Sequence, residues 1–325
     1  MTQFPSINPG YARVFQAGKL SVGVVVPIEN YARSSVPTMT EHVARVQQLE
    51  ELGFAALWIR DIPLQVPSFG DAGQTFDPFT YLGFLAGQTS EIALGVSSIA
   101  LPLHHPVHVA KAAATIDQLS GGRMLLGVAS GDRYEEYPGL GISYESRGER
   151  FQEAFAYLRK AAESFPELET SAFGRLNGKV DILPKPFGEK LPLLITGRSR
   201  QSLEWNVENG DGWMSYPKNI GQQTYLLKQW RGLIEESGRG NLPFMQPLYV
   251  DLVPQADAKP TPIHLGFRLG VKYLVDYFQL MQDIGVNHVA INLRFNQAHI
   301  PDTLHQLAEH LLPHFPTFQP QSHLS

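Results

Sequence analysis

Apolar runs rich in β-branched residues recur along this chain, and amphipathic stretches separate them. This alternation is typical of parallel strands joined by helical crossovers, because parallel strands are buried on both faces and read as nearly continuous apolar runs. We predict eight strands, at residues 22–26, 54–59, 92–101, 123–128, 191–196, 211–216, 248–253 and 288–293. The chain is therefore an α/β protein built from repeated strand-helix units.

The stretches between the runs have helical spacing. Phe151, Ala154, Phe155 and Leu158 stand at i, i+3, i+4 and i+7, which places them in one apolar stripe that can lie on a sheet. Eight such units without a break in composition predict a closed (β/α)8 barrel, in which active sites gather at the C-terminal ends of the strands. A doubly wound open sheet is the alternative, but no GxGxxG follows the first run.

Two stretches exceed what a minimal barrel needs. Residues 164–190 and 254–266 are rich in proline, and the first is also rich in glycine, so we predict excursion loops over the barrel mouth. They interrupt one domain, predicted to span residues 1–325, and do not link two domains. No internal repeat is present beyond the strand-helix alternation.

Composition excludes several classes of function. The formal net charge is -5 and the pI is near 6.1, so the chain offers no broad basic field for nucleic acid or anionic lipid. The absence of cysteine excludes disulfides, thiolate metal sites and thiol nucleophiles. Neither a secretory signal nor a run of about 18 apolar residues is found. We therefore predict a cytoplasmic protein without membrane segments.

Several predicted strands end in residues that could carry chemistry. The strand at 123–128 runs into small residues, which permit a planar ring to approach closely but equally permit a tight turn. Hydroxyls inside the apolar run 92–101 need partners if buried, and a bulge or a strained peptide at this point would fit them. An arginine and an aspartate close the strand at 54–59, either as a structural ion pair or facing a ligand. The residues concerned are Arg60, Asp61, Ser97, Ser98, Ala129, Ser130, Gly131 and Asp132.

The loop at 196–202 reads TGRSRQS and precedes a helical stretch. A glycine, cations and hydroxyls at a helix N-terminus suit a phosphate. The alternative is that Ser199 only caps the helix and that Arg198 and Arg200 are surface charges. Sequence alone leaves both interpretations open.

A histidine group follows the run 92–101. His104, His105 and His108 form HHxxH, but Pro106 interrupts the group and no carboxylate follows at metal-ligand spacing. We predict no metal site, and expect these histidines to pack at a helix end or to contact a substrate. GxSxG, Walker and HExxH motifs are also absent, so local sequence gives no support to nucleophilic hydrolysis, P-loop phosphoryl transfer or zinc-protease chemistry.

Taken in order, the motifs resemble those of the bacterial luciferase-like flavin monooxygenases. The resemblance covers about residues 20–312, and its most specific block is LPLHHPVHVAKAAATIDQLSGGR followed by LGVASG. It implies a (β/α)8 barrel that binds reduced FMN supplied by a separate reductase, or in some branches a deazaflavin. It further implies a bulged non-proline cis peptide at Ser97-Ser98 and phosphate contacts from Ser199, Ser202 and Arg147. The full cofactor set implied is Asp61, Ser97, Ser98, Ala129, Ser130, Gly131, Arg147, Gly197, Arg198, Ser199, Ser202 and Tyr216.

The sequence also departs from the family pattern. Many relatives place one or two histidines after the acid of the second strand, where this chain has Ile62-Pro63. The reactive cysteine of luciferase is Ala129 here, so light emission with an aldehyde is not implied. A basic residue that some relatives carry next is Ser130 here, which shifts the phosphate contacts toward Arg147 and Arg198.

The function implied is a monooxygenase that uses reduced FMN and O2 on a small, largely apolar organic molecule. Arg60, Asp61, His105 and Asp132 are the candidates to polarise the bound oxygen or orient the substrate. The alternatives are a flavin-binding protein without catalysis and a deazaflavin-dependent hydride-transfer enzyme. By the same resemblance we expect a homodimer and a reductase partner.

Overall fold

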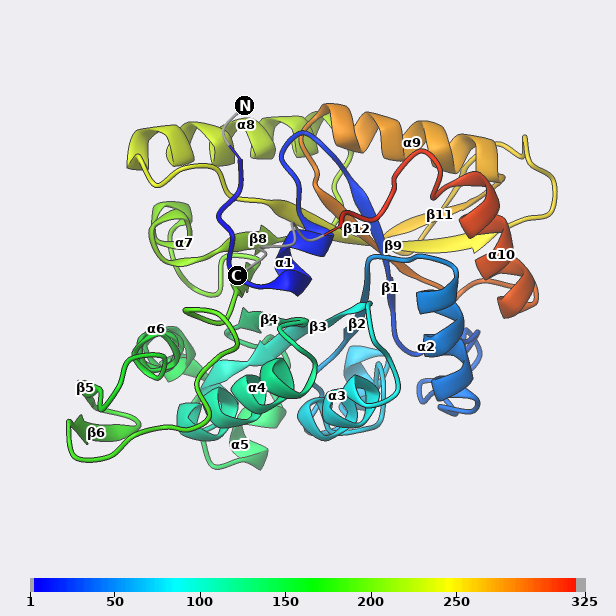
Figure 1. The fold of residues 1–325 in the computed structure, drawn as a ribbon. Coiled ribbons are helices and arrows are strands. Elements are labelled where there is room, and N and C mark those ends of the chain that lie inside the picture. Colours follow the sequence, from blue (N-terminus) through cyan, green and yellow to red (C-terminus); the bar gives the residue numbers. More distant parts are fainter. Residues whose placement is uncertain (1–2, 320–325) are drawn as a thin grey trace.

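Eight parallel strands close into a barrel in the computed structural model, which describes residues 3–319 (Figure 1). The order around the barrel is β9-β12-β1-β2-β3-β4-β7-β8, and β8 pairs with β9 to close it. The bounds are β1 Ser21–Val25, β2 Ala56–Ile59, β3 Ala93–Ala100, β4 Met124–Ala129, β7 Leu193–Thr196, β8 Gly212–Met214, β9 Phe244–Leu252 and β12 His288–Asn292. The predicted (β/α)8 barrel is thus confirmed. The predicted extent of 1–325 stays a prediction, since residues 1–2 and 320–325 lie outside the described residues.

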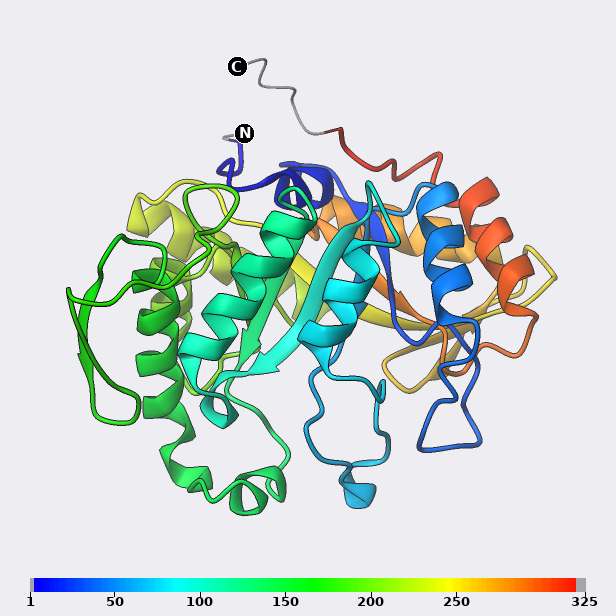
Figure 2. The same ribbon diagram turned by 60° about the horizontal axis from the view of Figure 1, so that its bottom comes forward.

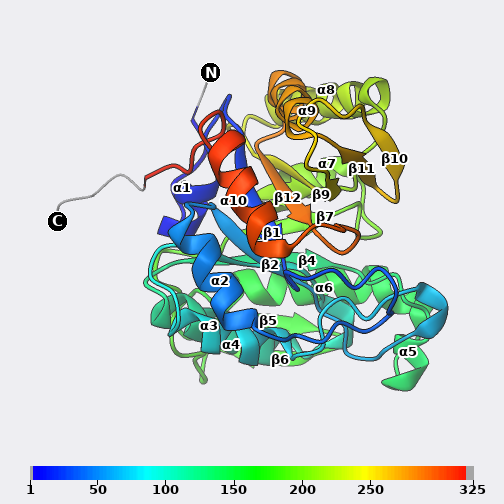
Figure 3. The ribbon, with the colours of Figure 1, turned by 90° about the vertical axis from the view of Figure 1, so that its right-hand side faces the viewer.

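Helices surround the barrel on the outside (Figures 1 and 3). Their bounds are α2 His42–Glu51, α3 Pro78–Ala86, α4 Pro106–Leu119, α6 Arg147–Lys160, α7 Leu203–Asn209, α8 Ile220–Ser237, α9 Val271–Asp283 and α10 Ile300–His310. The stripe predicted at 151–158 lies on α6, where Phe151, Ala154, Phe155 and Leu158 are all buried. These stripes pack on the outward side chains of the strands and form the largest of the three hydrophobic clusters within the described residues.

The strand predicted at 248–253 begins earlier, at Phe244, and ends at Leu252. Gln246 and Pro247 break the apolar pattern, so periodicity alone missed this half of the strand. Pro247 nevertheless lies in register with Ala290 of β12. A proline lacks only the N–H donor, so a strand can continue through it where that donor is not required.

The two excursions hold short strands that the sequence did not indicate. Residues 164–190 contain the hairpin of β5 (Glu167–Thr170) and β6 (Gly174–Asn177). It lies beside α6 on the outside of the barrel and not over its mouth (Figure 2), and Phe173 stacks edge-on against His105. Residues 254–266 lead through β10 (Thr261–Ile263) to β11 (Gly266–Leu269), which extends the sheet beyond β9. The sequence did not indicate these strands because they form by hydrogen bonding to neighbouring segments, which local residue patterns do not encode.

Large side chains fill the part of the barrel interior that lies beneath the C-terminal ends of the strands. Trp58 and His288 meet inside it, and glycines make the room: a Cβ on Gly95 would lie 2.3 Å from Trp58, and one on Gly23 would lie 2.6 Å from His288. Helix α1 (Pro9–Val14) joins the same cluster through Tyr11 and Val14. The barrel is therefore a packed core at this level and not a pore.

Hydrogen bonds fix the tautomer of His288. The indole N–H of Trp58 can only donate, and it does so to Nε2 of His288 at 2.9 Å. The ring proton therefore resides on Nδ1 and is donated to Oγ of Ser21 at 2.7 Å, while that hydroxyl donates to the carbonyl of Val14 at 2.6 Å. Complete burial lowers the pKa of His288 to about 3, so the ring is neutral at physiological pH.

Replacing His288 by leucine is expected to lower the free energy of unfolding by about 2 to 4 kcal/mol, because Trp58 and Ser21 each lose a buried partner. Urea unfolding at pH 7.5 measures this. His305→Leu, at an exposed position of α10, is the matched control and should change stability by less than about 0.5 kcal/mol. Equal effects of the two substitutions would show that the buried network contributes nothing.

Candidate functional site

A cavity of about 240 Å³ opens at the C-terminal rim of the barrel, between the ends of β2, β3, β4, β7 and β8. Most residues that the sequence pointed to meet there. Those that line it are Arg60, Asp61, Ser97, Ser98, Ala129, Ser130, Gly131, Asp132, Gly197, Arg198, Ser199 and Tyr216. Of the remaining candidates, His105, Arg147 and Ser202 do not line it.

The floor of the cavity is a bulge in β3. The peptide Ser97-Ser98 is cis, and the pairing of β3 with β4 shifts register between Val96 and Ile99. Gly127 on β4 makes room for this bulge, because a Cβ there would lie 2.2 Å from the carbonyl oxygen of Val96. The hydroxyl of Ser98 is hydrogen-bonded to that of Thr196 on β7. Two hydroxyls that needed partners in an apolar strand thus sit at an opening of the core.

The end of β4 presents backbone and no large side chain to the cavity. Gly131 adopts a left-handed conformation (φ 72°), and a Cβ there would lie 3.0 Å from the hydroxyl oxygen of Tyr137. That hydroxyl donates to the carbonyl of Ser130 and holds the turn against the cavity wall. The ring of Tyr137 is completely buried, so it shapes the loop from behind and leaves the cavity side free.

Asp61 is the acid that closes β2, and its carboxylate is held from two sides. Oδ2 accepts the backbone N–H of Ala100 at 3.0 Å and a hydrogen bond from Nε2 of His104 at 2.8 Å. Burial lowers the pKa of His104, but the hydrogen bond and charge of Asp61 outweigh it, and the net pKa is raised. The pair therefore fixes the end of β2 to the start of the α4 segment.

The structure corrects the choice of histidine. His105, chosen from sequence, is the N-cap residue of α4, and its ring packs against Tyr157 and Phe173 on the outside of the barrel. His104 is the one that reaches the site, from behind Asp61. The Pro106 that begins α4 at its first position was the available signal, because it makes His105 the cap and turns its ring outward.

Arginines at the rim share one acid. Asp71, from the loop after β2, binds Nη1 of Arg60 at 3.0 Å and also binds Arg294, which follows β12. Burial acts to lower the pKa of Arg60, yet Asp71 and the nearby tyrosines outweigh it and raise that pKa. Burial raises the pKa of Tyr216, which borders the same cavity. Arg60 is therefore a fixed cation in this wall.

The loop 196–202 has an unusual backbone. Gly197, Ser199 and Arg200 all have positive φ, at 58°, 48° and 64°. Ser199 donates its hydroxyl to the carbonyl of Thr196 at 2.8 Å, and Ser202, not Ser199, caps α7 by accepting the N–H of Trp205. Of the two interpretations of Ser199, helix capping is therefore wrong, since its hydroxyl turns back to the strand end.

Arg147 begins α6 beside this loop without reaching the cavity. Its Nη1 donates to the carbonyl of Tyr144 at 2.6 Å, and its guanidinium lies 3.5 Å from the centre of the Tyr144 ring. The backbone of α6 nevertheless touches the loop, because Gln201 donates to the carbonyl of Gly148 at 2.9 Å. A phosphate contact from Arg147 would require its side chain to leave Tyr144.

Arg133 and Glu136 line the cavity and were not among the sequence candidates. Both are almost fully buried, at 5% and 2% exposure, although they stand in a polar loop. Burial raises the pKa of Glu136 to about 7, because desolvation outweighs the attraction of Arg133. Arg133 follows Asp132 just after the small residues that end β4, but Glu136 stands three residues further on, so local sequence gave no signal that the two would meet in the cavity.

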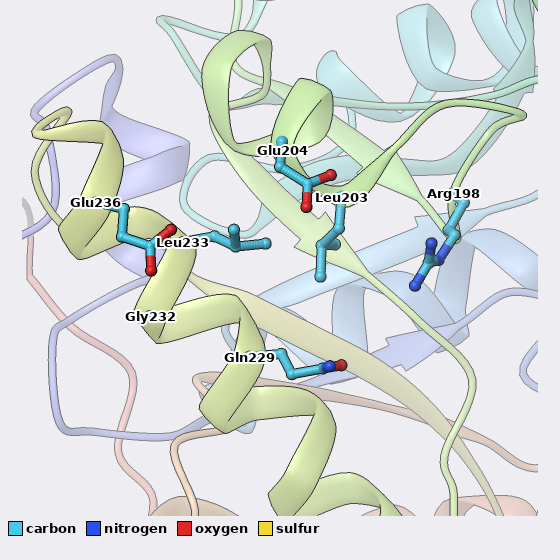
Figure 4. A pocket seen from close by; sticks show the side chains of 7 residues that line it. All are labelled: Arg198, Leu203, Glu204, Gln229, Gly232, Leu233 and Glu236. Atoms are coloured by element: carbon cyan, nitrogen blue, oxygen red, sulfur yellow. The ribbon is translucent and has the colours of Figure 1, made fainter.

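A second hollow, of about 310 Å³, lies between α7 and α8 (Figure 4). Glu204 and Glu236 stand on the two helices, and Arg198 stands at the far end of the hollow. Arg198 is the only predicted site residue there, so we place the site at the barrel rim and not in this larger hollow. Within residues 3–319 no group of three or more His, Cys, Asp or Glu could hold a metal ion. The helices of that same span include none long and apolar enough to cross a membrane.

Comparison with known proteins gives consistent matches. The model of a family described as luciferase-like monooxygenase matches residues 20–253. The alkanal monooxygenase beta chain of Photorhabdus luminescens is 27% identical over 184 residues, which are 54% of each chain.

Solved structures share the fold at lower identity. The oxygenating constituent of 3,6-diketocamphane monooxygenase from Pseudomonas putida, a type II Baeyer-Villiger monooxygenase in complex with FMN, aligns with a TM-score of 0.71 at 13% identity, over 93% of this chain and 100% of that chain. A coenzyme F420-dependent secondary alcohol dehydrogenase, in complex with an F420-acetone adduct, aligns with a TM-score of 0.73 at 16% identity, over 90% and 98%.

Replacing Asp61 by asparagine is expected to bring the pKa of His104 below its ordinary value, because burial, the largest influence on the ring, is then opposed only by the smaller effects of Asp77 and Glu136. A pH titration of the histidine ring resonances by NMR measures this, with His104→Gln used for assignment. Asp257→Asn, at an exposed position, is the control and should leave the His104 titration unchanged. If the pKa of His104 is the same in Asp61→Asn and Asp257→Asn, the interaction between Asp61 and His104 is contradicted.

The free energy of unfolding of Glu136→Gln, measured against that of the wild type, is expected to be higher at pH 8 than at pH 5. The pKa of Glu136 is raised to about 7 in the folded state, so wild-type stability falls as pH rises from the unfolded pKa toward 7. The variant does not titrate and avoids this loss, which we place at about 1 to 2 kcal/mol after allowing for solvent at the open mouth. Urea unfolding of both proteins at pH 5 and pH 8 measures the difference, and parallel pH profiles would contradict it.

Proposed function

The chain belongs to the luciferase-like monooxygenase family, and from that premise we propose that it oxidises a small organic substrate with O2, using reduced FMN bound at the barrel rim. One observation carries the proposal. The cavity at the C-terminal rim is floored by the β3 bulge and walled by residues without large side chains, from Ala129 to Gly131. A flat ring can lie there against backbone.

The residues present fit a flavin. Gly197 has open space where a Cβ would stand, so a large group can approach the turn after β7. Ser98 and Thr196 offer hydroxyls beneath, while Arg198 and the turned backbone at 197–200 lie at one end of the cavity. Concave backbone of this kind binds anions. We propose this end for the phosphate, with the hydroxyl of Ser199 rotating away from Thr196 to take part.

The bound flavin supplies the activation of O2, and the protein supplies position and a dry site. We propose that Ser97 and Ser98 support the ring, and that Arg60 and Asp132 orient the substrate beside it. Asp61 lines the cavity while Ala100 and His104 fix its carboxylate, so we assign His104 as a positioning residue and withdraw that role from His105. Tyr216 covers the ring from the β8 side.

We also propose a separate flavin reductase as partner, because the family's reduced FMN is delivered from outside. The substrate has a largely apolar body, in keeping with Ile62 and Phe69 at the cavity wall. A homodimer through the helices beside β2 and β3 is proposed by likeness to relatives, and the half-exposed ring of Phe84 on α3 is consistent with it. The proposed location is cytoplasmic.

The decisive experiment is an anaerobic titration of the purified protein with reduced FMN and, separately, with reduced coenzyme F420, followed by admission of oxygen. We expect tighter binding of FMN, and oxygen uptake that increases when a substrate is present. Preference for coenzyme F420 without use of oxygen would replace the proposal by hydride transfer, for which the fold of the alcohol dehydrogenase gives a precedent. Tight retention of oxidised FMN without substrate-dependent oxygen uptake would replace it by a non-catalytic flavin carrier.

A matched pair of variants shows where the flavin binds. Gly127→Ala should weaken FMN binding at least 10-fold, because its Cβ collides with Val96 and pushes the floor of the cavity upward. Gly83→Ala on α3, where no atom lies within 4 Å of the added Cβ, should leave FMN affinity unchanged. If Gly127→Ala and Gly83→Ala bind FMN with equal affinity, the flavin does not bind on the β3 bulge.

A further inference from the structure

Arg133 is a buried cation without a built-in partner. It lies in the loop after β4, it is only 5% exposed, and it lines the cavity. Its guanidinium stacks on the ring of Phe69 at 4.3 Å, and its Nη1 is buried without any hydrogen-bond partner. Within residues 3–319, no acid forms an ion pair with Arg133, whereas the neighbouring Arg60 is paired with Asp71. A buried charge is costly unless it is paired, so the position calls for an anion.

The other arginines of the rim and core show how this protein normally treats such groups. Arg60 and Arg294 share Asp71. Arg123, equally buried, donates to the carbonyls of Ser120, Ile92, Ala86 and Thr89. Arg60, Arg294 and Arg123 thus each have an acid or carbonyls as partners, although Nε of Arg294 is left without one. Arg133 differs from them because it has no acid or carbonyl partner within residues 3–319.

The nearby acids do not neutralise Arg133. Burial lowers its pKa first and Arg60 lowers it further, and together they outweigh Glu136, Asp71 and Asp132. Glu136 also lines the cavity, and its Oε1 is buried without a partner. Since the pKa of Glu136 is raised to about 7, this acid remains partly protonated at neutral pH and can donate a hydrogen bond.

We propose that Arg133 binds a carboxylate of the substrate, so that the organic molecule oxidised here is an acid whose apolar body lies along the cavity wall. The statement that the bound acid is the substrate rests on the proposed function. The anion site itself does not depend on it. The planar, bidentate donor face of a guanidinium matches a carboxylate, and Phe69 holds it in one orientation. The groups that act on the charge of Arg133 all come from the ends of β2 and β4, whereas the loop proposed for the FMN phosphate follows β7.

The test is a calorimetric titration of the protein with benzoate and with its neutral analogue benzamide, with and without saturating FMN. We expect benzoate to bind and benzamide to bind at least 10-fold more weakly. Arg133→Gln should weaken benzoate binding by about 10- to 100-fold, the loss of one charged hydrogen-bonding partner, and leave the dissociation constant of FMN unchanged. Arg175→Gln, at an exposed position of β6, is the matched control and should bind benzoate as wild type does.

Each outcome decides the matter. Equal binding of benzoate and benzamide to the wild-type protein overturns the anion site without any need for a variant. Competition between benzoate and FMN, with weaker FMN binding by Arg133→Gln, assigns the guanidinium to the cofactor phosphate and overturns the substrate role. If FMN does not bind but benzoate does so through Arg133, the proposed function fails while the carboxylate site stands.

Discussion

Closure of the barrel is the constraint on which the site depends. The pairing of β1 with β12 joins the first barrel strand to the last, the pairing of β8 with β9 completes the ring, and all eight barrel strands run parallel. Their C-terminal ends therefore meet at one rim, although Arg60 and Tyr216 are far apart in sequence. Without closure, the strand ends that carry charged and small residues would spread along the edge of an open sheet.

The side chains inside the barrel decide how deep the site can be. Trp58, Leu125, Met214 and Met245 fill the interior together with His288, and the neutral ring of His288 satisfies the polar atoms in that layer. Above them the bulge of β3 and the small residues after β4 leave space. The large residues inside the barrel support the small residues at the rim, because a closely packed layer gives the cavity a solid floor.

Much of this could be predicted from sequence, since eight buried strands separated by amphipathic helices specify a barrel and a barrel specifies the rim. What local patterns could not give is the direction of side chains. His104 and His105 are neighbours in sequence, and only the turn of the backbone at Pro106 decides which of the two rings reaches the site. Of the residues expected to contact a phosphate, Ser199 lines the cavity while Ser202 and Arg147 lie outside it, and each makes a local hydrogen bond that only the folded loop reveals.

Arg133 and Glu136 show the same limit in a stronger form. They are charged residues in a polar loop, and sequence alone would leave them in water. Phe69, from the loop after β2, covers the guanidinium, and the backbone N–H of Leu64 in the same loop hydrogen-bonds to Glu136. The electrostatics of the cavity thus arise from contact between two loops of different strands. Of the acids near Arg133, Asp71 is already held by Arg60 and Arg294, and burial keeps Glu136 partly protonated, so the positive charge of Arg133 remains without a partner at the cavity.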